Sequence, residues 1–143
     1  MDIIFTWESL EEVFDEFSHL FNNHYNEIFG KELEVDKDTF VSMERTGALF
    51  FLTARQDGKP SGYYLTVATP TVYNNTVVEA RDLGIYVIPA LRKNGITSNM
   101  QEIMDKELKE VGVDTVLVSY PYKSSIPVKA GYTMKEILYG REL

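Results

Sequence analysis

The segment from Leu83 to Val111 constrains the fold more than any other part of this chain. An apolar run ends at Val87-Ile88-Pro89, a polar turn follows at Arg92-Lys93-Asn94-Gly95, and a long amphipathic stretch begins directly after it. This order predicts a strand, a basic turn and the first turn of a helix. A helix start carries free N–H groups and the positive end of a dipole, and the turn adds cationic side chains there. We therefore expect this point to bind a phosphate or pyrophosphate group.

The composition favours one globular domain that spans residues 1–143. Hydrophobic residues make up 44% of the chain, enough to form a core, and the absence of cysteine excludes disulfides, thiolate metal sites and a cysteine nucleophile. The uncharged apolar runs fall short of the roughly 20 residues that cross a bilayer, and the first residues lack a signal-peptide pattern. We therefore expect a cytoplasmic protein with no membrane partner.

The net charge of −8 argues against nucleic acid as a partner, because an acidic surface repels the phosphate backbone. The densest basic spot is Arg92-Lys93, which suits a small phosphorylated ligand better than a polymer. An acidic exterior is also compatible with a cationic amine substrate. His19 and His24 are five residues apart, a spacing that does not place a ligand pair on one helical face, so we expect surface or half-buried histidines and no metal site.

The first third of the chain has the apolar spacing of helices, with acidic residues on the opposite face. Short polar residues precede these segments as caps, and glycines follow them. We expect helices that begin after Ser9 or Thr6, that cover His24–Phe29 and end at Gly30, and that cover Asp36–Arg45 with Asp36 or Asp38 as the cap and Gly47 as the stop.

The rest of the chain alternates between strand and helix patterns, with a hairpin signal at Asp57-Gly58. The strand–helix–strand order around the long helix implies a parallel pair with a right-handed crossover. The fold class is therefore α/β with a mixed, mostly antiparallel sheet. We expect strands at Ala48–Arg55, Pro60–Ala68, Val77–Ile88, Val113–Tyr120 and Met134–Tyr139, a long helix at Ile96–Val111 closed by Gly112, and a short helical segment at Ser124–Ala130.

This order and three motifs resemble the GNAT-type N-acetyltransferase family over essentially the whole chain. The family signature is Arg or Gln, two residues, Gly, one residue, then Gly or Ala, and here it stands as Arg92-Lys93-Asn94-Gly95-Ile96-Thr97. Val87-Ile88-Pro89 matches the strand before that turn, and Gly131-Tyr132 is similar to the family's Gly-Phe pair. In overall texture the chain is similar to the small acetyltransferase-like proteins of bacteriophages.

The resemblance implies an N-acetyltransferase that uses acetyl-CoA as co-substrate and acetylates an amine, on a small molecule or a protein. It implies that the backbone of Tyr86, Val87 and Ile88 binds the pantetheine arm like an added strand. It also implies that the signature turn wraps the pyrophosphate through Arg92, Lys93, Asn94, Gly95, Ile96 and Thr97.

Amine acetylation needs a base for the ammonium, a donor for the oxyanion and an acid for the thiolate. By resemblance Glu79 is the candidate base, with Asp82 on the opposite strand face as the runner-up; alternatively Glu79 is a strand-edge charge near Arg81. The candidate oxyanion donor is the N–H of Val87 or Ile88. Tyr122 is the candidate acid, because Pro127 stands where the family often has a tyrosine.

Two other functions stay open. Thr97 in place of Gly or Ala, together with Pro127, favours a GNAT-shaped binding or structural protein without catalysis, including a viral one. A nucleotide-phosphate binder of another α/β type is disfavoured because Gly95 is not followed by Lys and Ser or Thr. A homodimer also stays open, since several apolar residues near the ends could cover a partner or complete the core: Phe5, Trp7, Tyr139 and Leu143.

Overall fold

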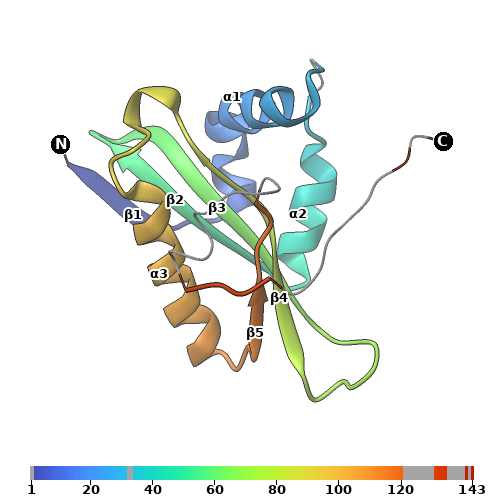
Figure 1. Ribbon diagram of the computed structural model, residues 1–143. Helices are drawn as coiled ribbons and strands as arrows, with labels where there is room; N and C mark the ends of the chain where they lie inside the picture. The colour runs from blue at the N-terminus through green and yellow to red at the C-terminus, as the bar shows by residue number, and fades with distance from the viewer. Residues whose placement is uncertain (1, 32–33, 121–130, 135–140, 142) are drawn as a thin grey trace.

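The computed structural model describes residues 2–31, 34–120, 131–134, 141 and 143. Helices and strands follow one another around a central sheet (Figure 1). The elements are β1 (Ile3–Trp7), α1 (Leu10–Phe29), α2 (Lys37–Arg45), β2 (Leu49–Gln56), β3 (Lys59–Pro70), β4 (Val78–Val87), the 3-10 turn η1 (Pro89–Leu91), α3 (Ile96–Glu110) and β5 (Thr115–Leu117).

The five strands form one mixed sheet in the order β1-β2-β3-β4-β5. Neighbours are antiparallel except β4 and β5, which are parallel, so the predicted parallel pair is confirmed. The predicted hairpin is also confirmed: Asp57 and Gly58 both have positive φ, 50° and 79°, as the tight turn between β2 and β3 requires.

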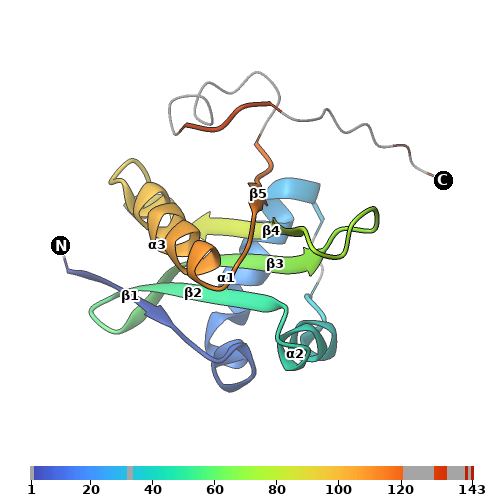
Figure 2. The same ribbon diagram turned by 90° about the horizontal axis from the view of Figure 1, so that it is seen from below.

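The sheet has helices on both faces (Figure 2). On one face α3 buries a stripe at a spacing of four residues, Ile96, Met100, Met104 and Leu108, against the sheet. On the other face α1 buries a largely aromatic set, which α2 extends with Phe40. The buried side chains of α1 are Leu10, Phe14, Phe17, Leu20 and Phe21.

The N-terminal prediction was wrong in two respects. No strand was expected before the first helix, but Ile3–Trp7 forms β1, an edge strand that pairs with β2, a segment some fifty residues away in the chain. The helix expected at His24–Phe29 is the second half of α1, which runs unbroken to the left-handed Gly30. Ser9, not Thr6, caps α1.

The predictions from α2 onward fared better up to β5. Asp36 caps α2, and α3 ends within one residue of the predicted Val111. β5 is shorter than predicted and covers Thr115–Leu117. Ser124–Ala130 and most of Met134–Tyr139 lie outside the described residues. Among the described helices, none combines the length and the apolar character that a membrane span needs.

One ion network holds β2 to the start of the chain. Arg55 donates from Nε and Nη2 to the Glu8 carboxylate, at 2.9 and 3.1 Å, and also binds Glu16. Its guanidinium lies 5.0 Å from the centre of the Phe17 ring. Burial raises the pKa of Glu8, but the hydrogen bonds from Arg55 and Thr53 outweigh it and hold that pKa below its usual value. Arg55 therefore joins β2, α1 and the short link between β1 and α1.

We predict that Arg55→Ala lowers the free energy of unfolding by about 2 kcal/mol, between the values typical of exposed and of fully buried ion pairs. The reason is that Glu8 keeps its negative charge in a largely covered position without a partner. Urea denaturation measures the change. Arg45→Ala is the matched control, because Arg45 binds Glu11 at 2.6 Å on an exposed surface; equal losses in the two variants would contradict the prediction.

Candidate functional site

The site is organised by a bulge in β4. Leu65 pairs with Gly84 while the next residue, Thr66, pairs with Asp82, so Leu83 is an extra residue in β4. A bulge changes the edge toward which the following backbone groups point. The residues of β4 whose backbone groups face β3 therefore alternate in a different phase before and after Leu83.

β5 separates from β4 just before the bulge. The two strands pair from Glu79–Thr115 to Arg81–Leu117, and the Ser119 N–H then donates to the Asp82 carboxylate at 3.0 Å instead of to a backbone carbonyl. β4 continues to Val87 beside β3. Within the described chain, the last part of β4 thus has a strand on one side and an open edge on the other (Figure 1).

The backbone groups on this open edge can be identified from one hydrogen bond. The Ile88 N–H donates to the Ser61 carbonyl at 2.9 Å, so Ile88 and, by alternation, Tyr86 face β3. Ile85 and Val87 then face the open edge. Of the three residues predicted to bind the pantetheine arm, only Val87 points its backbone there; the Ile88 N–H, a candidate oxyanion donor, is bonded to β3.

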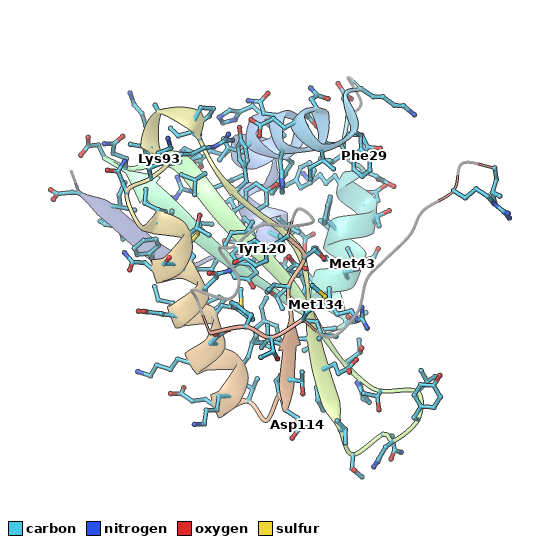
Figure 3. The ribbon with its side chains drawn as sticks, viewed as in Figure 1. Phe29, Met43, Lys93, Asp114, Tyr120 and Met134 are labelled. Carbon is cyan, nitrogen blue, oxygen red and sulfur yellow. The ribbon has the colours of Figure 1, made fainter. Side chains whose placement is uncertain are left out.

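The turn between β4 and α3 forms a cavity of about 200 Å³. Gly95 takes a left-handed φ of 74° at the N-cap of α3 and has no side chain to cover the first-turn N–H groups. Lys93 is also left-handed, with φ of 68°, and Figure 3 shows it at the end of the molecule opposite Asp114. The wall includes Lys93, Gly95, Ile96, Thr97 and Ser98. These groups make the cavity suited to an anion.

The side chains of two residues predicted to bind pyrophosphate, Asn94 and Ile96, make their contacts within the protein. The Asn94 side chain donates to the Leu91 carbonyl at 3.0 Å and thereby closes the turn. The Ile96 side chain is buried in the core beneath α3. Their contribution to a ligand would come from the backbone.

A second cavity of about 500 Å³ lies beside the first and shares three residues with it, Val87, Arg92 and Thr97. It lies between the second half of α1 and the open end of β4. Sequence reasoning missed its α1 wall, although His24, Glu27 and Ile28 have the spacing of one helical face. The full wall is His24, Glu27, Ile28, Ile85, Tyr86, Val87, Arg92 and Thr97.

Arg92 connects the two cavities. Its Nη2 donates to both carboxylate oxygens of Glu27 at 2.9 Å, and its Nε donates to the Val87 carbonyl at 2.9 Å. The guanidinium lies 5.3 Å from the centre of the Tyr86 ring. The side chain predicted to bind pyrophosphate is thus paired with a carboxylate of α1 in this structure.

His24 lies against the backbone of β4. Its Nδ1 is 2.5 Å from the Tyr63 hydroxyl, and its ring stacks on Tyr86 with 5.1 Å between centroids. A Cβ on Gly84 would lie 2.9 Å from Cε1 of His24, so glycine is needed for this contact. Burial lowers the pKa of His24, Glu27 raises it, and Arg92 lowers it further, so that the net shift is downward. The surroundings of His24 therefore favour its neutral form.

The predicted catalytic carboxylates lie elsewhere on β4. The described cavity walls do not include Glu79, which is 4.0 Å from Arg81 where β4 and β5 are still paired. It lies five residues before Gly84, about 16 Å along the strand. Asp82 lies at the fork between β4 and β5, and burial raises its pKa although Ser119 partly opposes this. Tyr122 and Pro127 lie outside the described residues.

Comparison with known proteins identifies the fold. No family model and no curated protein sequence matches the chain. The glucosamine-6-phosphate N-acetyltransferase of Arabidopsis thaliana has a similar structure, with TM-score 0.80, 11% identity and 99% of both chains covered. A GNAT family acetyltransferase of Staphylococcus aureus has TM-score 0.74, 13% identity and 100% of both chains covered. The fold is that of the GNAT acetyltransferases.

A third GNAT-like structure was determined with acetyl-CoA. It is a predicted acetyltransferase from Clostridium acetobutylicum, with TM-score 0.77, 16% identity, and 99% of this chain and 96% of that chain covered. At such identities the likeness establishes the shared fold, and the predicted fold class is confirmed.

We predict that Gly84→Ala displaces His24, because the new methyl group would overlap the imidazole. The free energy of unfolding should fall by about 1–3 kcal/mol, the usual cost of overpacking. NMR of the histidine side chains provides the test, with the exposed His19 as the internal control. Unchanged His24 resonances in the variant would show that the contact is not present in solution.

Proposed function

We propose that this protein is an acetyl-CoA-dependent N-acetyltransferase that moves an acetyl group to an amine. The observation that carries the proposal is the continuity of the anion cavity at the start of α3 with the open edge of β4, since both walls share Val87 and Thr97. A diphosphate joined to an extended amide-containing arm has the chemistry to occupy both. The acetyl-CoA in the Clostridium structure supports the same assignment.

Each part of the site has a role in this proposal. The first-turn N–H groups of α3 and Lys93 bind the pyrophosphate, while Thr97 adds a hydroxyl donor. The backbone groups of Ile85 and the N–H of Val87 bind the arm, since the Val87 carbonyl is taken by Arg92. The cavity beneath α1 is the place for the acceptor, a small-molecule amine or an amine of a protein.

We predict that coenzyme A binds in calorimetric titration and that Arg92→Glu combined with Gly95→Val weakens binding at least about tenfold, or 1.4 kcal/mol. Glutamate would repel the pyrophosphate, and valine is strained at the left-handed φ of 74°. Arg45→Glu is the control, because Arg45 lies on exposed α2. Thermal unfolding of each variant verifies that it is folded. If the wild-type protein does not bind coenzyme A at millimolar concentration, the proposed function is wrong.

Thr97 is the observation that favours a second candidate, a GNAT-fold binding protein without catalysis. Its β-branched side chain lies on the wall of both cavities, where the family signature has Gly or Ala. A thiol-release assay with acetyl-CoA and several amines separates the two functions. Coenzyme A binding without thiol release above the rate of hydrolysis would establish the second candidate.

We predict that Glu27→Gln tightens coenzyme A binding about two- to fivefold, the range expected from releasing an exposed ion pair. The carboxylate competes with the pyrophosphate for Arg92, since both oxygens of Glu27 are 2.9 Å from Nη2. Glu11→Gln is the matched control, because it releases Arg45 on a distant surface. Weaker binding by Glu27→Gln would mean that the pair instead holds Arg92 in its ligand-binding position.

A further inference from the structure

We propose that His24 is a catalytic residue of this acetyltransferase, and that its Nε2 accepts the proton that the acceptor amine loses. This inference rests on the proposed function and assigns the proton acceptor to α1, not to a carboxylate of β4. It is carried by the position of the imidazole, by the hydrogen bond that orients it, and by the charges around it.

The position of His24 coincides with the beginning of the open edge. Its ring touches Gly84, the residue directly after the bulge at Leu83 and beyond the fork at Asp82. It lines the same cavity as Ile85 and Val87, whose backbone groups face that edge. An acyl group carried by an arm along the edge would therefore come next to the imidazole, and an amine in the cavity would lie between them.

The imidazole is held in a defined orientation. Tyr63 contacts Nδ1 at 2.5 Å, and Tyr86 stacks on the ring face at 17°. When the Nδ1–H donates to the Tyr63 oxygen, the neutral imidazole carries its lone pair on Nε2. Burial raises the pKa of Tyr63 far above its usual value, so the phenol stays neutral beside the ring.

The neighbouring charges keep His24 in the form that can accept a proton. The groups facing it are Glu27 on its own helix, Arg92 from the turn, Tyr63 from β3 and Tyr86 from β4. Glu27 is paired with Arg92, and the net effect of burial and these charges lowers the pKa of His24. A neutral imidazole at pH 7 is poised for general-base catalysis.

The step balances without any further reactant. Nε2 takes one proton from the ammonium, and the amine nitrogen then attacks the thioester carbonyl carbon. The C–S bond breaks as the C–N bond is completed, and the second nitrogen proton goes to the leaving thiolate. The imidazolium afterwards returns its proton to water.

The carboxylates considered from the sequence are placed less well for this step. Glu79 lies in the part of β4 that β5 still covers. Asp82 accepts the Ser119 N–H, and it shares a strand face with Ala80, which belongs to the core beneath α3. His24 lies on the α1 face, where the larger cavity is.

The test compares His24→Gln with His19→Gln, a matched control on an exposed position of the same helix. The probes are acetyl-CoA with glucosamine 6-phosphate, spermidine, and a peptide with a free N-terminus and a lysine. For the amine that turns over fastest, we expect His24→Gln to lower kcat/KM at least about 100-fold. We expect His19→Gln to match the wild type and both variants to bind coenzyme A alike.

The pH profile separates catalysis from a structural role. In the wild type kcat/KM should rise through the pKa of His24, which is lowered from its usual value, and then level off, because the imidazole deprotonates a bound ammonium. In His24→Gln only free amine can react, so the rate should climb about tenfold per pH unit up to the pKa of the amine. A His24→Gln profile that keeps the wild-type plateau overturns the proposal.

Two further measurements make each outcome decisive. If His24→Gln unfolds at the assay temperature, His24→Ala is assayed with added imidazole; restored turnover supports the proposal, and none overturns it. Wild-type protein that binds coenzyme A but acetylates no amine overturns the role of His24. Wild-type protein that does not bind coenzyme A overturns the proposed function itself, so the two failures are distinguishable.

Discussion

The divergence of β5 from β4 is the constraint on which the rest of the site depends. Parallel pairing stops at Arg81, the Asp82 carboxylate takes the next N–H, and the extra residue Leu83 redirects the backbone beyond it. Backbone N–H and C=O groups need partners, so an edge left open by the neighbouring strand favours an extended polar ligand. The helix start after Gly95 lies at the end of that edge, so the cavity at the start of α3 and the open edge of β4 are continuous.

The two faces of the sheet contribute different parts of the site. On the α3 face a regular apolar stripe anchors the helix whose N-terminus forms the anion cavity. On the α1 face the packing turns from aromatic to polar at His24, where the helix meets the bulged part of β4. Arg92 bridges these regions through Glu27 and Tyr86. Arg92 therefore links the turn to the cavity beneath α1.

Local patterns account for what could be predicted. The periodicity of α3, the Asp57-Gly58 turn and the caps at Ser9 and Asp36 depend on neighbouring residues, and each was confirmed. β1 was missed because an edge strand is defined by its partner β2 and not by its own alternation. Glu79 was predicted as a base because it lies early on β4. Which part of β4 has an open edge depends on where β5 separates from it, and this point is set by the tertiary structure.

The sequence by itself determined the strand–turn–helix unit with its cationic turn, since two cations, a glycine and a helix start follow one another closely in the chain. Only the tertiary structure decided which side chains join that unit. His24 and Glu27 lie more than fifty residues from Gly84 and Arg92, and they meet because the aromatic face of α1 packs across β3 and β4. Such meetings depend on packing between distant segments, which no local spacing encodes.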